Sequence, residues 1–217
     1  MAKEFLDPKD TETIGEWKPD RPLPRPVRDF GKYPNFDEWQ PGSLLLFHIP
    51  EKTPWISRLI VKTQERAYDF EHARWHHAAV YVGDGFLCEA RIRGGVQYRP
   101  LDDYVGKHQI RVRFDDRMSH PQGYKLAIRA MTRLRESYGF NEIAKLSWRA
   151  IKGFGARSPL ALGPKGVICS HLYDMAYRGA TKRLLFDTGD RPIMPAELSQ
   201  TVELKDVSVY WRRIAQS

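Results

Sequence analysis

Two strand-length apolar runs, 78–82 and 86–90, are separated by the short turn Gly83-Asp84-Gly85. A glycine-containing turn of this length predicts a β-hairpin that pairs residues near 81 and 87. Gly94-Gly95 follows and opens a further short strand. These features predict an antiparallel meander, because consecutive strands joined by tight turns pair with one another.

Other segments extend this scaffold. Pro41-Gly42 precedes an apolar strand at 43–47, and 110–114 alternates apolar and basic residues, as expected of a strand with one solvated face. Apolar spacing predicts a buried stripe along the longest helix. The expected stripe residues are Leu126, Ile128, Ala130, Met131 and Leu134. Predicted helices cover 55–67, 121–137, 142–151, 170–180 and 195–198, with an irregular glycine-rich loop at 153–166 and a closing strand near 207–210.

Residues 1–38 form a proline-rich N-terminal arm, and residues 39–217 form the domain. Proline fixes φ and lacks a backbone donor, so the arm is expected to contain neither a helix nor a central strand. We expect an extended chain that lies on the domain through aromatic anchors or binds a partner. The expected anchors are Trp17, Phe30, Tyr33 and Phe36.

Composition limits the partners and the compartment. The chain has 217 residues, 41% of them hydrophobic, which suffices for one core. A net charge of +8 favours anionic partners such as acidic cell-wall polymers or anionic lipid, or reflects a solvated surface. The chain has no basic run interleaved with aromatics, so we expect no specific nucleic-acid binding. The N-terminus has no apolar signal region, so we expect synthesis in the cytoplasm or export by a route without an N-terminal mark.

Cys169 has the most informative setting of the two cysteines. A glycine-rich loop and Val167-Ile168 lead into it, and an amphipathic helix follows. A sulfur at a helix N-terminus is stabilised as thiolate by unpaired N–H groups and the helix dipole. The alternative is a small buried core residue. Adjacent residues of a strand point to opposite faces, so Cys88 faces away from Glu89 and is expected to be buried and inert.

A base for this sulfur is expected among the seven histidines. His76 and His77 stand at the start of the 78–82 strand, before two small residues that leave space for an approaching group. Glu89 on the next strand falls near His77 and is suited to orient it. The alternatives are surface residues at a strand edge.

These motifs resemble the NlpC-type papain-like cysteine peptidases. The resemblance rests on 75–85, on 41–47, on Glu89-Ala90 with Gly94-Gly95-Val96, and on Ile168-Cys169-Ser170-His171-Leu172. The order, with the His strand first and the Cys helix last, is similar to the permuted branch that includes YiiX/YaeF-like and lecithin:retinol acyltransferase-like proteins. It covers about residues 39 to 200 and implies an α+β papain-like core.

The resemblance implies a site and a chemistry. Cys169 would be the nucleophile, His77 the general base and Glu89 the third residue, with the Cys169 backbone N–H at the oxyanion. No metal or cofactor is expected. Residues expected to bind substrate are His76, Tyr81, Tyr138 and Ser170.

The implied activity is hydrolysis of an amide bond by a thiol peptidase or amidase. A bacterial cell-wall peptide (peptidoglycan) is the first choice of substrate. The absent signal suggests an antibacterial effector toxin delivered into the periplasm of a target cell, or a phage lysis factor. The arm would then be the contact for a cognate immunity or secretion partner. The alternatives are a lipid-directed acyltransferase or thioesterase, which an apolar tunnel would favour, and a catalytically silent binding module.

Overall fold

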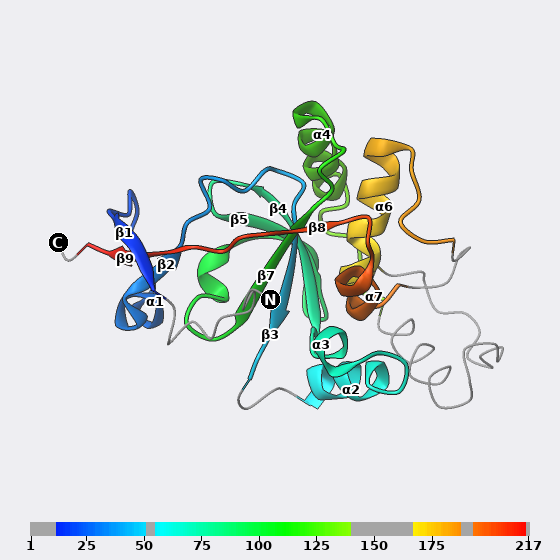
Figure 1. Cartoon of the computed structure of the whole chain (residues 1–217), viewed down its shortest axis with the longest axis horizontal. Coiled ribbons are helices and arrows are strands. Elements are labelled where there is room, and N and C mark those ends of the chain that lie inside the picture. Colours follow the sequence, from blue (N-terminus) through cyan, green and yellow to red (C-terminus); the bar gives the residue numbers. More distant parts are fainter. Residues whose placement is uncertain (1–11, 51–54, 140–166, 188–192, 216–217) are drawn as a thin grey trace.

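The centre of the computed structural model is an antiparallel sheet of six strands (Figure 1). The structure describes residues 12–50, 55–139, 167–187 and 193–215. Along the sheet the strand order is β6-β5-β4-β3-β7-β8. The strands are β3 (Leu44–His48), β4 (His77–Gly83), β5 (Phe86–Arg91), β6 (Gly95–Pro100), β7 (Gln109–Phe114) and β8 (Lys205–Val207). The predicted meander is confirmed, because β4, β5 and β6 are neighbours in chain order.

The hairpin between β4 and β5 has the predicted register. Tyr81 pairs with Leu87, and Val80 pairs with Cys88. All three turn residues adopt positive φ, at 115° for Gly83, 49° for Asp84 and 71° for Gly85. Left-handed backbone in a tight turn matches the twist of the two strands. One step further along the ladder, Glu89 comes beside Ala79 at the end of β4 where His77 lies.

Five helices of the described chain lie on one side of this sheet (Figure 1). They are α2 (Trp55–Gln64), α3 (Phe70–Ala73), α4 (His120–Met131), α6 (Cys169–Thr181) and α7 (Pro195–Gln200). Of these, α4 and α6 pack directly on its strands. Leu126 of α4 and Leu172 of α6 share one core cluster with Ala78 and Val80 of β4. The molecule is therefore α+β, with an antiparallel sheet packed against helices.

The N-terminal segment packs on the other face of the sheet. Its elements are β1 (Thr13–Trp17), α1 (Arg25–Phe30) and β2 (Lys32–Pro34), and a second sheet has the order β1-β9-β2, with β9 at Trp211–Ile214. Tyr33 is buried in the second core cluster, and Trp17, Phe30 and Phe36 pack against it, which confirms the aromatic anchors.

The expectation that the arm contains no helix is wrong. Pro26 is the second residue of α1, where a backbone N–H has no partner within the helix, so proline costs little there. Gly31 ends α1 with φ 74° and donates its N–H to the Val27 carbonyl at 3.1 Å. A six-residue helix thus fits between the prolines.

The predicted stripe of α4 is wrong in part. Leu126 and Ala130 are buried, but Ile128 is 55% exposed because a residue two positions from Leu126 points to another side of a helix. The helix also ends at Met131, so Leu134 lies beyond it. The buried face is instead completed by Gly123 and Ala127.

The basic residues of β7 are buried, contrary to the predicted solvated face. Arg113 donates hydrogen bonds to the carbonyls of Leu198 at 2.7 Å and Ser199 at 2.8 Å. Arg111 donates to Asp206 of β8 through Nε at 2.6 Å. The end of α7 and β8 therefore cover this face with acceptors.

The tail differs from its prediction as well. Residues 208–210 join β8, which pairs with β7 in the large sheet, to β9 in the small sheet. The predicted helix at 142–151 and the loop at 153–166 lie outside the described residues. Within the described ranges, no helix has both the length and the apolarity needed to span a membrane.

Candidate functional site

The first residue of α6 meets the first residue of β4. Ile168 is the N-cap of α6, with extended backbone and no side-chain cap, and Cys169 begins the first turn. The His77 side chain lowers the pKa of the Cys169 thiol through hydrogen bonding and charge, and the backbone N–H groups of Ala78 and Ser170 act in the same direction. The structure therefore brings together the two residues expected to be nucleophile and base.

Glu89 completes this arrangement from β5. Its Oε2 lies 2.5 Å from Nε2 of His77, and its side chain is fully buried. Because Nε2 faces the carboxylate, Nδ1 is the ring nitrogen left for the sulfur. His77 thus contacts Glu89 through one ring nitrogen and interacts with the Cys169 thiol.

Tyr104 supports both His77 and Glu89 and was not foreseen from the sequence. Its hydroxyl donates a hydrogen bond to Oε2 of Glu89. Its ring stacks on Phe47 at 3.8 Å between centroids and lies nearly parallel to the His77 imidazole at 5.9 Å. These contacts fix the plane of the imidazole as well as the position of the carboxylate.

Gln64 anchors the backbone that precedes His77. Its buried amide donates to the carbonyl of Ala73 at 2.7 Å and to that of Trp75 at 2.8 Å, and it accepts the Ala196 N–H at 2.9 Å. One side chain thus joins the end of α2, the entry to β4 and the start of α7. A buried amide with three partners restricts motion of this segment.

The electrostatics favour a thiolate–imidazolium pair. Burial alone lowers the pKa of His77, but the charge of Glu89 and hydrogen bonds to Cys169 and Glu89 raise it to about 10. Burial alone raises the pKa of Cys169, but the hydrogen bond and charge of His77 and the backbone N–H groups lower it overall. Burial instead raises the pKa of Cys88 to about 12, so this cysteine remains a thiol.

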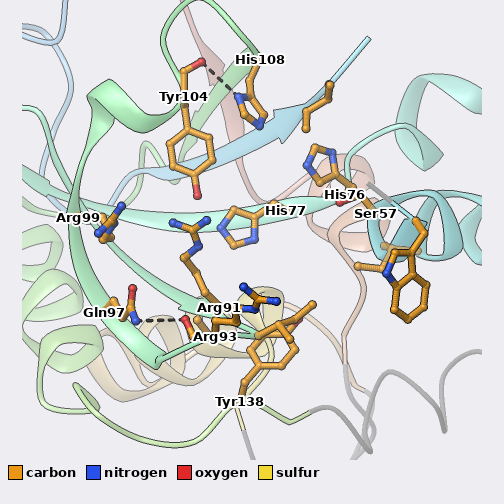
Figure 2. A pocket seen from close by; sticks show the side chains of 15 residues that line it. Ser57, His76, His77, Arg91, Arg93, Gln97, Arg99, Tyr104, His108 and Tyr138 are labelled. Carbon is orange, nitrogen blue, oxygen red and sulfur yellow. Dashed lines mark hydrogen bonds between the residues drawn. The ribbon is translucent and has the colours of Figure 1, made fainter. Parts of the chain in front are cut away.

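A cavity of about 570 Å³ opens beside His77 (Figure 2). Its walls come from α2, from the β5–β6 hairpin and from the segments that hold Tyr104 and Tyr138. The lining residues are Ile49, Trp55, Ser57, Ile60, His76, His77, Ala90, Arg91, Ile92, Arg93, Gln97, Arg99, Tyr104, His108 and Tyr138. The candidate base is thus accessible to a bound molecule.

Two further histidines line this cavity as neutral groups. The rings of His76 and His108 lie 5.9 Å apart in a stacked arrangement. Burial and the charge of His77 lower the pKa of His76 to about 2. Burial also lowers the pKa of His108 to about 4. At neutral pH both imidazoles can donate or accept hydrogen bonds without adding charge.

Two of the four residues expected to bind substrate reach the cavity, namely His76 and Tyr138. The other two are placed elsewhere. Tyr81 is buried in the core, where its ring packs edge-on against Trp39 at 5.5 Å. The Ser170 hydroxyl is buried and donates to the Ile193 carbonyl, so only the Ser170 backbone N–H faces the sulfur.

The arginines of the β5–β6 hairpin were also missed. Arg91 pairs with Gly95, and Glu89 pairs with Gln97, so alternate residues from Glu89 to Arg99 project from the same face of the sheet. In the sequence, the two-residue period of a strand and the Gly94-Gly95 turn indicated that these arginines share a face with Glu89. Tyr104 had no comparable local signal.

Comparison with known proteins shows the fold alone. No protein-family model matches the chain, and no curated protein matches it. A crystal structure of the metalloprotein YiiX from Escherichia coli O157:H7 matches with a TM-score of 0.54 and 17% identity, over 78% of this chain and 96% of that chain. The chain therefore has a YiiX-like fold.

The description of YiiX as a metalloprotein raises the question of a metal site here. Among the residues that the structure describes, no group of three or more His, Cys, Asp or Glu side chains is arranged to hold a metal ion. Nε2 of His77 already faces Glu89. The described side chains therefore do not fit a metal centre.

Proposed function

We propose that the protein is a cysteine hydrolase that cleaves an amide bond with Cys169 as nucleophile and His77 as base. One observation carries the proposal: Nε2 of His77 lies 2.5 Å from Oε2 of buried Glu89, and the same imidazole interacts with the Cys169 thiol at the start of α6 and lowers its pKa. A nucleophile, a base and an orienting group in one chain is the arrangement that activates a thiol.

Acylation begins from the ion pair. The Cys169 thiolate attacks the carbonyl carbon and forms the sulfur–carbon bond, while the carbonyl oxygen becomes negative. The N–H groups at the start of α6 have no side-chain cap and are suited to hold this oxyanion, the Cys169 N–H among them. His77 then donates its proton to the amide nitrogen, the carbon–nitrogen bond breaks, and the amine leaves.

Deacylation uses the same groups in reverse. Neutral His77 takes a proton from a water molecule while the water oxygen attacks the thioester carbon. The sulfur–carbon bond breaks, the carboxylic acid leaves, and the sulfur is again a thiolate beside imidazolium. Glu89 stabilises the charged imidazole in the resting state, and Tyr104 holds Glu89 in place.

The cavity supports a peptide substrate, with bacterial cell-wall peptide as the first choice. Three arginines and a glutamine line it, and the chain carries a net charge of +8. Peptidoglycan peptides carry carboxylates, which guanidinium groups bind well. A lipid-directed enzyme would need an apolar tunnel, and a wall with three guanidiniums does not favour one.

Digestion of purified peptidoglycan, followed by mass analysis of the released fragments, tests this function. We expect new peptide termini with the unaltered chain and none with Cys169→Ala or His77→Ala. Fragments that are unchanged with the active chain would contradict the cell-wall substrate. Amide cleavage that survives Cys169→Ala would overturn the mechanism.

A further inference from the structure

Three guanidinium groups lie on one wall of the cavity, and all three belong to the β5–β6 hairpin. Arg91 ends β5, Arg93 lies in the turn and Arg99 lies on β6. In Figure 2 these arginines lie on one side of His77, and His76 lies on the other. The charge of the cavity is therefore concentrated on one side.

Nearby carboxylates leave this wall positive. Glu89 faces the imidazole of His77 at 2.5 Å. Asp103 accepts a hydrogen bond from Nε of Arg99 at 2.8 Å, and Arg91 forms ion pairs with Asp103 at 3.7 Å and with Glu89 at 3.8 Å. The Arg93 guanidinium contacts no carboxylate in the part of the chain that the structure describes. Arg93 is thus available to an anion, and Arg91 and Arg99 add positive charge beside it.

The opposite wall adds no negative charge. His76 and His108 are neutral near pH 7, because burial lowers the pKa of His76 to about 2 and that of His108 to about 4. Trp55 and Ile60 of α2 supply apolar surface there. A ligand would therefore meet cations on one side and neutral groups on the other.

We propose, on the basis of the hydrolase function above, that the guanidinium wall binds a substrate carboxylate close to the scissile amide. The planar fork of arginine matches a carboxylate with two parallel hydrogen bonds. The three guanidiniums and His77 line the same cavity, so a carboxylate bound by this wall lies in the cavity that the base faces.

Two alkylating probes test the anion site without any hydrolysis. Iodoacetate and iodoacetamide both react with a thiolate, forming a sulfur–carbon bond as iodide leaves. Iodoacetate carries a carboxylate, and iodoacetamide carries a neutral amide in its place. The measured quantity is the rate constant for iodoacetate at Cys169 divided by that for iodoacetamide. Mass analysis of the Cys169 peptide over time gives both rate constants. The ratio is then divided by the same ratio for glutathione, which corrects for the intrinsic reactivity of the two probes. The His77 imidazolium adds to this ratio in every variant, so comparison among variants isolates the arginines.

Arg93→Gln is the cleanest variant, because the side chain is exposed and has no carboxylate partner among the described residues. We expect it to lower the ratio about 3- to 10-fold, with the iodoacetamide rate unchanged. Arg25→Gln removes the same charge from α1, away from the cavity, and should leave the ratio unchanged. The difference in this ratio between the unaltered chain and Arg93→Gln should shrink in 1 M salt, where the screening length is about 3 Å. Equal ratios in all variants would overturn the proposal.

Paired peptides separate this proposal from the proposed function. Each pair has a glutamate or a glutamine within two residues of the scissile amide. We expect the unaltered chain to favour the glutamate peptide about tenfold in kcat/KM, and Arg93→Gln to lose that preference. Equal cleavage of both peptides would overturn the anion site while the hydrolase function stands. Arginine-dependent alkylation without cleavage of any peptide would overturn the hydrolase function while the anion site stands.

Discussion

Nε2 of His77 lies 2.5 Å from Oε2 of Glu89, across the hairpin formed by β4 and β5. The carboxylate is fully buried, and its main compensating charge is the imidazolium. Burial alone raises the pKa of Glu89, but the charge and hydrogen bond of His77, with the hydrogen bond from Tyr104, lower it overall. This pair therefore determines the protonation state of the candidate base, and through it that of Cys169.

Thiol labelling should distinguish the two cysteines near neutral pH. Both are buried, but the pKa of Cys169 is lowered and that of Cys88 is raised to about 12. At pH 7 roughly one Cys88 in 10⁵ is a thiolate. We expect iodoacetamide to modify Cys169 at least about 100-fold faster, measured by peptide mass analysis over time. Equal, slow labelling of both residues would favour a catalytically silent module.

The pH profile of kcat/KM should be bell-shaped. The reactive species is thiolate with imidazolium, so activity falls in acid as the Cys169 thiolate takes a proton. It falls in base as His77 loses its proton near its raised pKa of about 10. Activity should therefore persist well above pH 7. A basic limb near pH 6.5, the ordinary pKa of histidine, would contradict the ion pair.

Glu89→Gln should narrow the pH range of full activity from both sides. Without the carboxylate, the pKa of His77 falls and its imidazolium stabilises the Cys169 thiolate less, so the basic limb moves down and the acid limb moves up. We expect kcat at neutral pH to drop about 10²- to 10⁴-fold, in the range of general acid–base contributions. A lower kcat with unmoved limbs would indicate a purely structural role for Glu89.

Tyr104→Phe removes the hydroxyl that donates to Glu89 and keeps the ring that stacks on Phe47. We expect kcat to fall about tenfold at neutral pH, since a hydrogen bond to a charged group is lost. The loss should grow in acid, because the pKa of Glu89 rises when this donor is absent. Tyr98→Phe on β6 is the matched control, because Tyr98 is exposed and does not line the cavity.

Arg113→Ala should lower the stability of the fold and leave the reactivity of Cys169 unchanged. The guanidinium donates to carbonyls at the end of α7 and is buried. Its removal leaves buried acceptors unpaired, so we expect the free energy of unfolding to fall by about 3 kcal/mol. Urea denaturation measures this loss. Iodoacetamide labelling of Cys169 in the folded variant should keep its rate, and a proportionate loss of reactivity would contradict a structural role.

Local rules predicted the parts of the site that lie close together along the chain. The turn at 83–85 and the two-residue period of a strand bring Glu89 to the end of β4 that holds His77, and the pattern around Cys169 predicts a helix start. Backbone geometry over a few residues determines each of these features. The same period could have revealed the arginines of the β5–β6 hairpin.

Packing between distant segments decided the rest. Tyr104 reaches Glu89 because its ring stacks on Phe47 from another strand, and Arg113 is buried because α7 ends above β7 and presents its carbonyls. Likewise, α6 lies against β4, so that its first residue meets His77. The sequence by itself determined strands, turns and the thiolate-favouring helix start, because these depend on neighbours along the chain. Only the tertiary structure decided which side chains meet and which charges are buried, because those depend on contacts between residues far apart in sequence.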